Sequence, residues 1–397
     1  MVESLIFHKD TQNEGLFTER ELREKGLSPS HYANVLHYAR SGFEGCRADV
    51  DRSDNVLYGI GLMDNAKRFQ TTLSYLNLSL PENFGNLREQ FQSRHKDVVA
   101  ELERRNNPLE SQRTDSRFLE ISPDYFMERV VETVKANYDS GALAELHVDP
   151  FFCYIRPVAY RSDLRHNREI VDSLGVFGLR HEPVFEISVR AARPYIKGNP
   201  KLVVSPEGVI SPHLNYKLGI NYVPYGRGKD EAVYNGFSEV LFTTPRSDKP
   251  FVAFAQRVKD PLINEGGGEN FFGFTQDGRI ITPPASNGRI LPGTKRALVI
   301  EIARNLGLVV QEEEIPLHEL KQLKGVFLTG TWAGLEQVEV IFDPVTDDVA
   351  LYQPGSIEPL NILQAEYKAV IKGGKLAAKA NEAVRNRIRT PILTLNS

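Results

Sequence analysis

The sequence predicts an α+β or α/β fold with two unequal layers of mixed sheet, divided between two domains. Three observations support this prediction. The chain has 397 residues, more than one small core usually contains. Short apolar runs alternate with helix-like amphipathic runs, most regularly in the second half. Segment 191–200 contains two prolines and a glycine, so it is the expected linker between domains at 1–190 and 201–397.

In the first half, strands are expected at 35–38, 55–60, 151–157 and 185–192. A helix is expected at 64–78, with Asp64 as its cap. A second helix is expected to start at Ser122 and run to about residue 138. Between them, about 83–122 is predicted to be a charged surface insertion with one solvated helix at 88–105. A structural role is favoured for this insertion, with dimer contact as the alternative.

In the second half, strands are expected at 202–204, 238–243, 271–274, 279–282 and 326–328. One helix is expected at 294–306, ended by Gly307, and another at 362–372. The basic run from Lys375 to Arg389 is interpreted as a solvated helix.

Composition and charge exclude several classes of function. The net charge is −4, so no large basic surface for nucleic acid is expected. The two cysteines form neither a metal-ligand pattern nor a disulfide framework, and no metal site is predicted. No run approaches the roughly 20 apolar residues of a membrane span, and no signal peptide is recognised. These observations favour a cytoplasmic protein without a membrane partner.

Lys217 and Glu265 are the residues that indicate a chemistry. Lys217 lies among tyrosine, leucine, glycine and isoleucine, where burial would lower the pKa of its amine, as a Schiff-base lysine requires. Glu265 precedes three glycines, which would let the backbone pass closely under a flat ring, and its carboxylate would keep a pyridine nitrogen protonated. The alternatives are a surface lysine and a solvated loop glutamate. Together the two residues predict a pyridoxal-phosphate enzyme.

Other segments contain candidate ligands for such a cofactor. Thr294, at a predicted helix start, offers a hydroxyl and backbone N–H groups to a phosphate, or is an ordinary helix cap. The turn at 330–334 would present backbone amides to a phosphate or a substrate carboxylate, or is a plain turn. Arg68 is a bidentate phosphate donor or a solvated helix residue. Glu269 is a candidate partner for the Tyr222 hydroxyl, which would in turn bond the phenolic oxygen of the cofactor.

Taken together, these segments resemble the branched-chain amino-acid aminotransferases, within the class-IV (fold-type IV) pyridoxal-phosphate enzymes. The resemblance extends, with gaps, from about residue 33 to 345. The segments that carry it are 37–45 (HYARSGFEG), 154–157 (YIRP), Lys217 with Tyr222, 265–270 (EGGGEN), 281–284 (ITPP), 291–293 (LPG) and 330–331 (GT). Each segment alone is a weak signal, but their order and spacing make the set specific.

The resemblance implies a smaller N-terminal α/β domain and a larger C-terminal mixed-sheet or pseudo-barrel domain that binds the cofactor. Lys217 would form the Schiff base and move the proton, Glu265 would bind the pyridine nitrogen, and Tyr222 would tune the phenolic oxygen. The other implied cofactor-binding residues are Arg68, Gly268, Glu269, Asn270, Leu291, Thr294, Lys295, Gly330 and Thr331. The implied substrate-binding residues are Tyr38, Phe43, Tyr154, Arg156, Trp332 and Ala333.

The activity that the resemblance implies moves an amino group between a branched-chain or similar hydrophobic L-amino acid and a 2-oxo acid such as 2-oxoglutarate, in a homodimer. Two departures bear on the site. Lys295 replaces the usual threonine and would bind phosphate as a point charge. Trp332 replaces a small residue and should reshape the pocket. The segments 83–122, 241–264 and the tail past 372 are also longer than the family pattern.

Two other functions follow from these departures. One is a class-IV transaminase for a non-standard substrate, either a biosynthetic amino acid or an R-amine. Trp332 favours it, while Glu269 and Arg156 argue against the amine version. The other is a non-catalytic protein that has kept the fold. Such a protein would be expected to lose Lys217 or Glu265, and both are present.

Overall fold

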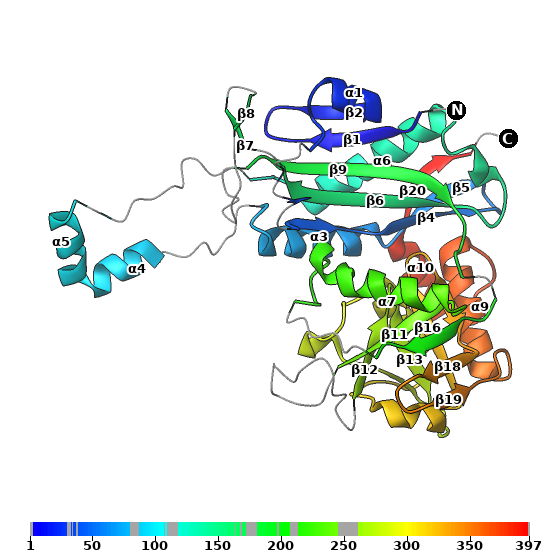
Figure 1. Cartoon of the computed structure of the whole chain (residues 1–397). Helices are drawn as coiled ribbons and strands as arrows, with labels where there is room; N and C mark the ends of the chain where they lie inside the picture. Colours follow the sequence, from blue (N-terminus) through cyan, green and yellow to red (C-terminus); the bar gives the residue numbers. More distant parts are fainter. Residues whose placement is uncertain are drawn as a thin grey trace.

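The computed structural model describes residues 3–29, 33, 35, 36, 39–79, 87–106, 108, 118–162, 164–166, 169–171, 181–196, 198–206, 213–244 and 261–395. Two large sheets form the framework, one above the other in Figure 1, with helices packed on each. The predicted α+β class is confirmed.

The first sheet has eight strands, all paired antiparallel, in the order β2-β1-β9-β6-β4-β5-β20, with β3 paired to β6. Its strands are β1 (Leu5–Lys9), β2 (Glu14–Thr18), β3 (Ser41–Phe43), β4 (Cys46–Asp51), β5 (Val56–Ile60), β6 (Phe152–Arg161), β9 (Pro183–Ala192) and β20 (Arg389–Thr394). Helices α3 (Leu62–Tyr75) and α6 (Pro123–Asp139) pack on this sheet. Phe69, Phe126 and Phe185 are buried between the helices and the sheet.

The starts of these helices follow local chemistry. The Ser122 hydroxyl accepts the Tyr125 N–H at 3.0 Å, so the predicted cap of α6 is confirmed. The predicted cap of α3 is wrong, because Gly61, in the left-handed region at φ 68°, precedes the helix and Asp64 lies in its first turn. The strand expected at 35–38 is also not formed, since Val35 and Leu36 are helical, and residues 37 and 38 lie outside the described residues.

The second sheet has ten strands in the order β15-β14-β13-β12-β11-β10-β18-β19, with β16 joining β13 to β17. It is mixed, because β10 runs parallel to β11 and β18, and β14 runs parallel to β15. Its strands are β10 (Lys201–Val204), β11 (Glu239–Thr244), β12 (Leu262–Gly266), β13 (Asn270–Phe274), β14 (Ile280–Thr282), β15 (Val310–Glu312), β16 (Gly325–Gly330), β17 (Gly334–Gln337), β18 (Val340–Asp343) and β19 (Asp348–Leu351).

Helices α8 (Thr294–Asn305), α9 (Glu358–Lys372) and α10 (Ala380–Ile388) pack with strands of this sheet around a shared apolar core. Helix α7 (Tyr222–Tyr234) packs with β11 in a smaller cluster. The shorter helical elements are α1 (Glu19–Glu24), η2 (Ala144–His147), η3 (Gly219–Asn221), η4 (Ala285–Asn287) and η5 (Leu317–Gln322).

Two segments differ from their prediction. The charged insertion contains two helices, α4 (Leu87–Arg94) and α5 (Lys96–Arg104), which lie apart from the rest of the chain in Figure 1. The basic tail is a helix but not a solvated one, because Val384 and Ile388 of α10 are buried in the core. A two-stranded ribbon, β7 (Leu164–His166) with β8 (Glu169–Val171), completes the described elements.

Strand β20 returns to the first sheet, where it pairs antiparallel with β5. The predicted second domain, 201–397, includes β20, so the pairing of this strand with the first sheet departs from the predicted division into domains. The division at 191–200 otherwise stays a prediction. No helix among the described residues is both long enough and apolar enough to cross a bilayer.

Candidate active site

The backbone of Lys217 is held by the first sheet and by α3. Its carbonyl accepts the Phe43 N–H at 3.1 Å, and its N–H donates to the Thr72 hydroxyl at 3.3 Å. A glycine is required at position 42, because a Cβ there would lie 2.5 Å from the Thr72 methyl carbon. Residues 41–43, the SGF part of the 37–45 segment, therefore position Lys217, although they lie about 175 residues before it in the sequence.

The Lys217 amine lies in an aromatic and partly buried environment. Its Nζ is 2.7 Å from the Tyr222 hydroxyl and 4.9 Å from the centroid of the Phe43 ring. Burial, with a contribution from the positive charge of Arg68, lowers the pKa of Lys217 to about 7. A substantial fraction of this amine is therefore neutral at physiological pH, as a nucleophilic lysine requires.

Glu265, at the end of β12, is buried and accepts three hydrogen bonds. The donors are the Tyr225 hydroxyl at 3.0 Å, the Asn270 side-chain amide at 3.0 Å and the Leu291 backbone N–H at 3.1 Å. Burial raises the pKa of Glu265 to about 7, against the lowering effect of these donors. A cation at this position, such as a protonated ring nitrogen, would favour the carboxylate form.

Tyr225 is a site residue that was not predicted from the sequence. It lies three residues after Tyr222 on α7, and the two rings are 5.7 Å apart. Residues with this spacing share one face of a helix, which is the signal that could have identified Tyr225.

Glu269 does not bond Tyr222, so that expectation is wrong. Its carboxylate accepts the Tyr195 hydroxyl and the Gly268 N–H, the latter at 3.1 Å. Tyr195 lies in the expected linker, and no spacing in the sequence connects it with Glu269. Burial raises the pKa of Glu269 to about 7.

Two of the glycines after Glu265 pack closely on buried side chains. A Cβ at Gly266 would lie 3.1 Å from the Glu269 carboxylate, and a Cβ at Gly267 would lie 2.8 Å from that of Glu239. Gly268 alone faces open space. Glycine at 266 and 267 therefore lets the turn pack closely on two buried carboxylates.

Arg68 is a largely buried residue of α3 rather than a solvated one, since only 10% of its side chain is exposed. Two of its nitrogens donate to the two carboxylate oxygens of Glu44, at 2.8 and 2.7 Å. The sequence suggested a phosphate as the bidentate partner of Arg68, but in this structure the partner is Glu44. A third nitrogen donates to the Pro292 carbonyl at 3.1 Å, so Arg68 also joins the two halves of the chain. Glu44 belongs to the FEG motif, but its role was not predicted.

Thr294 and Lys295 begin α8. Gly293 occupies the N-cap position and Thr294 follows it, so Thr294 is not the cap. The Thr294 hydroxyl oxygen is buried and has no hydrogen-bond partner among the described residues. The Lys295 amine donates to the Ile60 carbonyl at 2.8 Å, and burial lowers its pKa to about 8.

The substrate-pocket residues predicted from the sequence come together, except that Tyr38 lies outside the described residues. The Tyr154 ring lies 4.4 Å from that of Trp332, and the Arg156 guanidinium lies 4.5 Å from the centroid of the Phe43 ring. Ala333 is buried beside them.

The turn at 330–334 is held from the first sheet. Arg47 of β4 donates to the carbonyls of Thr331 and Trp332, each at 3.4 Å. This residue was not predicted from the sequence. A Cβ at Gly330 would lie 3.1 Å from the Gly268 carbonyl oxygen, so the GT turn packs closely on the EGGGEN turn.

Residues 116–341 match the profile of a family described as amino-transferase class IV, over more than half of the chain. The chain belongs to the class-IV aminotransferases.

Curated relatives of this class-IV aminotransferase include branched-chain aminotransferases. That of Helicobacter pylori (strain J99) is 24% identical over 346 residues, covering 83% of this chain and 80% of the relative. The mitochondrial branched-chain-amino-acid aminotransferase 1 of Arabidopsis thaliana is 32% identical over 221 residues, covering 54% of this chain. The matches span only 50% of the Arabidopsis protein and 65% of a probable branched-chain aminotransferase of Aquifex aeolicus.

Solved structures agree on the fold of this class-IV aminotransferase. A branched-chain aminotransferase of Thermoproteus uzoniensis, crystallised with norvaline, superposes with a TM-score of 0.69 at 21% identity, covering 98% of this chain and all of that one. The Escherichia coli branched-chain enzyme superposes with a TM-score of 0.66 at 17% identity, over 98% of this chain and 100% of that one. The expected fold-type IV architecture is confirmed.

The residues of this class-IV aminotransferase fit pyridoxal phosphate. A buried carboxylate, Glu265, matches a ring nitrogen, and the partly neutral Lys217 amine matches an aldehyde. The unpartnered Thr294 hydroxyl at the start of α8 matches a phosphate.

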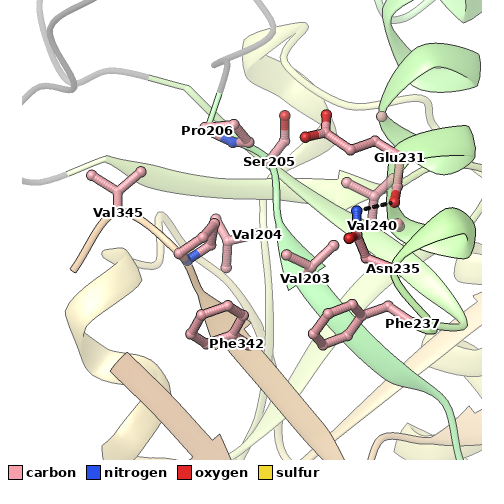
Figure 2. A pocket seen from close by; sticks show the side chains of 13 residues that line it. Val203, Val204, Ser205, Pro206, Glu231, Asn235, Phe237, Val240, Phe342 and Val345 are labelled. Carbon is pink, nitrogen blue, oxygen red and sulfur yellow. Dashed lines mark hydrogen bonds between the residues drawn. The ribbon is translucent and has the colours of Figure 1, made fainter. Parts of the chain in front are cut away.

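Figure 2 shows a separate cavity of about 460 Å³, between β10, α7 and β18. Its lining is mainly apolar and includes Val203, Val204, Phe237, Val240 and Phe342. None of the predicted site residues line it, so this cavity of the class-IV aminotransferase is distinct from the site around Lys217.

Proposed function

We propose that this protein is a pyridoxal-phosphate-dependent aminotransferase that exchanges an amino group between a branched-chain or similar hydrophobic L-amino acid and a 2-oxo acid such as 2-oxoglutarate. The observation that carries this proposal is the Lys217 amine. It has a pKa lowered to about 7 and lies 2.7 Å from the Tyr222 hydroxyl, beside an aromatic pocket. Branched-chain enzymes among the relatives support the choice of substrate.

In this proposal each residue has a defined task. Bound pyridoxal phosphate would supply an electron sink for the substrate α-carbon. Lys217 would hold the aldehyde and take the proton from that carbon. Glu265 would keep the ring nitrogen protonated, and Tyr222 would contact the phenolic oxygen.

The phosphate would lie at the start of α8, against Thr294 and the adjoining backbone amides, with Lys295 adding positive charge. Gly330, Thr331 and Ala333 would bind the substrate carboxylate through backbone amides of the turn. Arg68 would contribute by positioning the segment at Pro292. Asn270 and Leu291 would act through their hydrogen bonds to Glu265.

The location and assembly of the protein belong to the same proposal. We propose a cytoplasmic homodimer with two domains, divided at 191–200, in which residues 389–394 return to the first sheet. Gel filtration with light scattering tests the dimer, and a mass near 45 kDa would contradict it, because the chain has a mass of 44.7 kDa.

The deciding experiment is the visible absorption spectrum of the purified protein before and after addition of L-leucine. A yellow band that leucine converts to the pyridoxamine form supports both the cofactor and the substrate class. A band that leucine leaves unchanged keeps the cofactor and rejects the branched-chain substrate. Absence of any band after addition of pyridoxal phosphate rejects the proposal.

A second candidate keeps the cofactor but changes the substrate to a non-standard amino acid or an R-amine. The observation that favours it is Trp332, whose ring lies 4.4 Å from that of Tyr154 in the expected pocket. A panel of amino donors that includes (R)-1-phenylethylamine separates the two candidates.

A further inference from the structure

The apolar cavity in Figure 2 is bounded by helix α7 and by strands β10, β11 and β18. Its volume of about 460 Å³ falls within the roughly 300–1,000 Å³ that is usual for small-molecule pockets. The rings of Phe237 and Phe342 stack at one end, with their centroids 6.1 Å apart. Side chains that line such a space lack packing partners on one side, so a ligand with an apolar body would gain contacts there.

The other end of the cavity has a single negative charge. Glu231 is the only charged residue that lines it, and Figure 2 shows its carboxylate at the end opposite to the two phenylalanine rings. Within the described part of the chain, this carboxylate forms no ion pair, since the nearby Lys229 is paired with Glu239. The Asn235 side-chain amide already donates to the Glu231 backbone carbonyl at 2.9 Å. The cavity therefore suits an apolar ligand that carries one positive charge.

Helix α7 connects this cavity with the site around Lys217. Its first turn carries Tyr222, whose hydroxyl is 2.7 Å from the Lys217 amine, and Tyr225, which donates to Glu265 at 3.0 Å. Glu231 lies six residues after Tyr225 on the same helix, which is a distance of about 9 Å along the helix axis. One short helix therefore contacts both the cavity and the residues proposed to act in catalysis.

The helix packs closely on β11 between these two sites. A Cβ at Gly228 would lie 2.8 Å from the Phe242 ring. Phe242 packs in turn on the Tyr225 ring, with centroids 4.6 Å apart. Because close-packed interiors transmit displacements, a shift of α7 at the cavity would also move Tyr225 relative to Glu265.

We propose that this cavity is a second ligand site, which binds a small apolar molecule carrying one ammonium group, and that α7 transmits its occupancy to Lys217. The apolar body would lie against Phe237 and Phe342, and the ammonium group would pair with the Glu231 carboxylate. Such a ligand would regulate the protein without entering the site around Lys217. The ligand site itself is independent of the proposed function, and only the effect of its occupancy on the cofactor rests on it.

The test uses benzyltrimethylammonium as the probe, because its quaternary nitrogen cannot form a Schiff base with an aldehyde cofactor. Benzyl alcohol is the neutral comparison, and isothermal titration calorimetry measures the binding of each to the cofactor-loaded protein. Glu231→Gln should weaken the cation about fivefold, the upper value for an exposed ion pair, and change benzyl alcohol less than about twofold. Asp230→Asn is the matched control, because it removes an exposed charge from the adjacent position of α7, outside the cavity lining, and it should bind both probes as the wild type does.

Two further variants separate the space in the cavity from its charge. Val203→Phe places a ring in the cavity and should abolish binding of both probes, with circular dichroism as the check on folding. Glu231→Lys, at an exposed position that does not threaten folding, should repel the cation and still bind benzyl alcohol. In the wild type, saturating benzyltrimethylammonium should change the apparent affinity for pyridoxal phosphate about fivefold, a typical coupling between two sites, and Val203→Phe should remove this effect.

Several outcomes would overturn the proposal. Binding of the cation that survives in folded Val203→Phe would place the probe elsewhere, and equal affinity in the wild type and both Glu231 variants would remove the role of the charge. Absence of binding by either probe would leave the cavity without a ligand, and binding that does not alter cofactor affinity would remove the connection through α7. The proposed function fails separately. If no amino donor changes the cofactor spectrum while cation binding still depends on Glu231, the cavity site stands and the transaminase does not.

Discussion

Tyr225 donates a hydrogen bond to Glu265 at 3.0 Å, from a position one helical turn beyond Tyr222. Tyr222 contacts the Lys217 amine from the same helix. Helix α7 therefore connects the two groups on which the proposed chemistry depends, and a small shift of this helix would affect both.

Replacing Tyr225 by phenylalanine should lower kcat about tenfold without loss of the cofactor, because one donor to a buried carboxylate is removed. The pKa of Glu265, about 7 in this structure, should rise further, since the lost hydrogen bond favoured the charged form. Steady-state kinetics and the cofactor spectrum measure the effect. Tyr234→Phe, at the exposed end of α7, is the control, and an equal kcat in both variants would contradict the assignment.

Replacing Lys217 by alanine should preserve the fold and abolish covalent attachment of pyridoxal phosphate. Transamination should fall by at least about 10²–10⁴-fold, the range typical of positioned proton transfer. Mass spectrometry after borohydride reduction detects the attachment, and Lys201→Ala on β10 is the control. An alanine variant at 217 with substantial activity would reject this role for the lysine.

The rate at which the cofactor-free protein captures pyridoxal phosphate should depend on pH, with a midpoint near 7. Below that pH the Lys217 amine is protonated and cannot attack an aldehyde, and above it the amine is neutral, so the rate should rise and then level off. Burial contributes most to the lowered pKa of this amine. Arg68 and Arg156 lower the pKa further, whereas Glu44 and Glu265 raise it. Stopped-flow absorbance measures the rate, and a midpoint near 10 would show that the amine is not perturbed.

Replacing Thr294 by valine should weaken binding of pyridoxal phosphate about tenfold, through loss of one hydrogen bond to a charged phosphate. The same change should leave the cofactor-free protein as stable as before or more stable, because the hydroxyl is buried without a partner there. Affinity by spectral titration and unfolding by urea are measured together. A variant that loses stability but not affinity would assign Thr294 to the fold alone.

Replacing Glu44 by glutamine should destabilise the protein by about 3–5 kcal/mol, because it leaves the buried charge of Arg68 unpaired. Glu19→Gln removes an exposed ion pair with Arg23 and should have little effect. Urea unfolding of both variants gives the comparison. A small change for Glu44→Gln would mean that Arg68 finds another partner.

Much of the site could be predicted from the sequence because its motifs are short and local. The tight hairpin between β12 and β13 brings Glu265 next to Asn270. Leu291, from another expected cofactor-binding segment, also contacts Glu265. The position of Lys217 was also predicted, because the residues around it are distinctive.

The partners of these residues could not be predicted, because they come from distant segments. Glu44 and Arg68 are 24 positions apart, and Tyr195 and Glu269 are 74 apart. No periodicity connects residues at such separations, so only the folded chain shows that the bidentate partner of Arg68 is a carboxylate. The predicted cap of α3 was wrong for a different reason, since a left-handed glycine, Gly61, starts the helix three residues before Asp64.

The pairing of β20 with β5 has a consequence for synthesis of the protein. The ribosome makes β5 early, whereas residues 389–394 emerge only after all the strands of the second sheet. Until then, the outer edge of β5 has unpaired backbone groups on which strands from other nascent chains could dock. Fusion partners or truncations that delay or remove β20 should therefore increase aggregation during expression, even when the residues around Lys217 are unchanged.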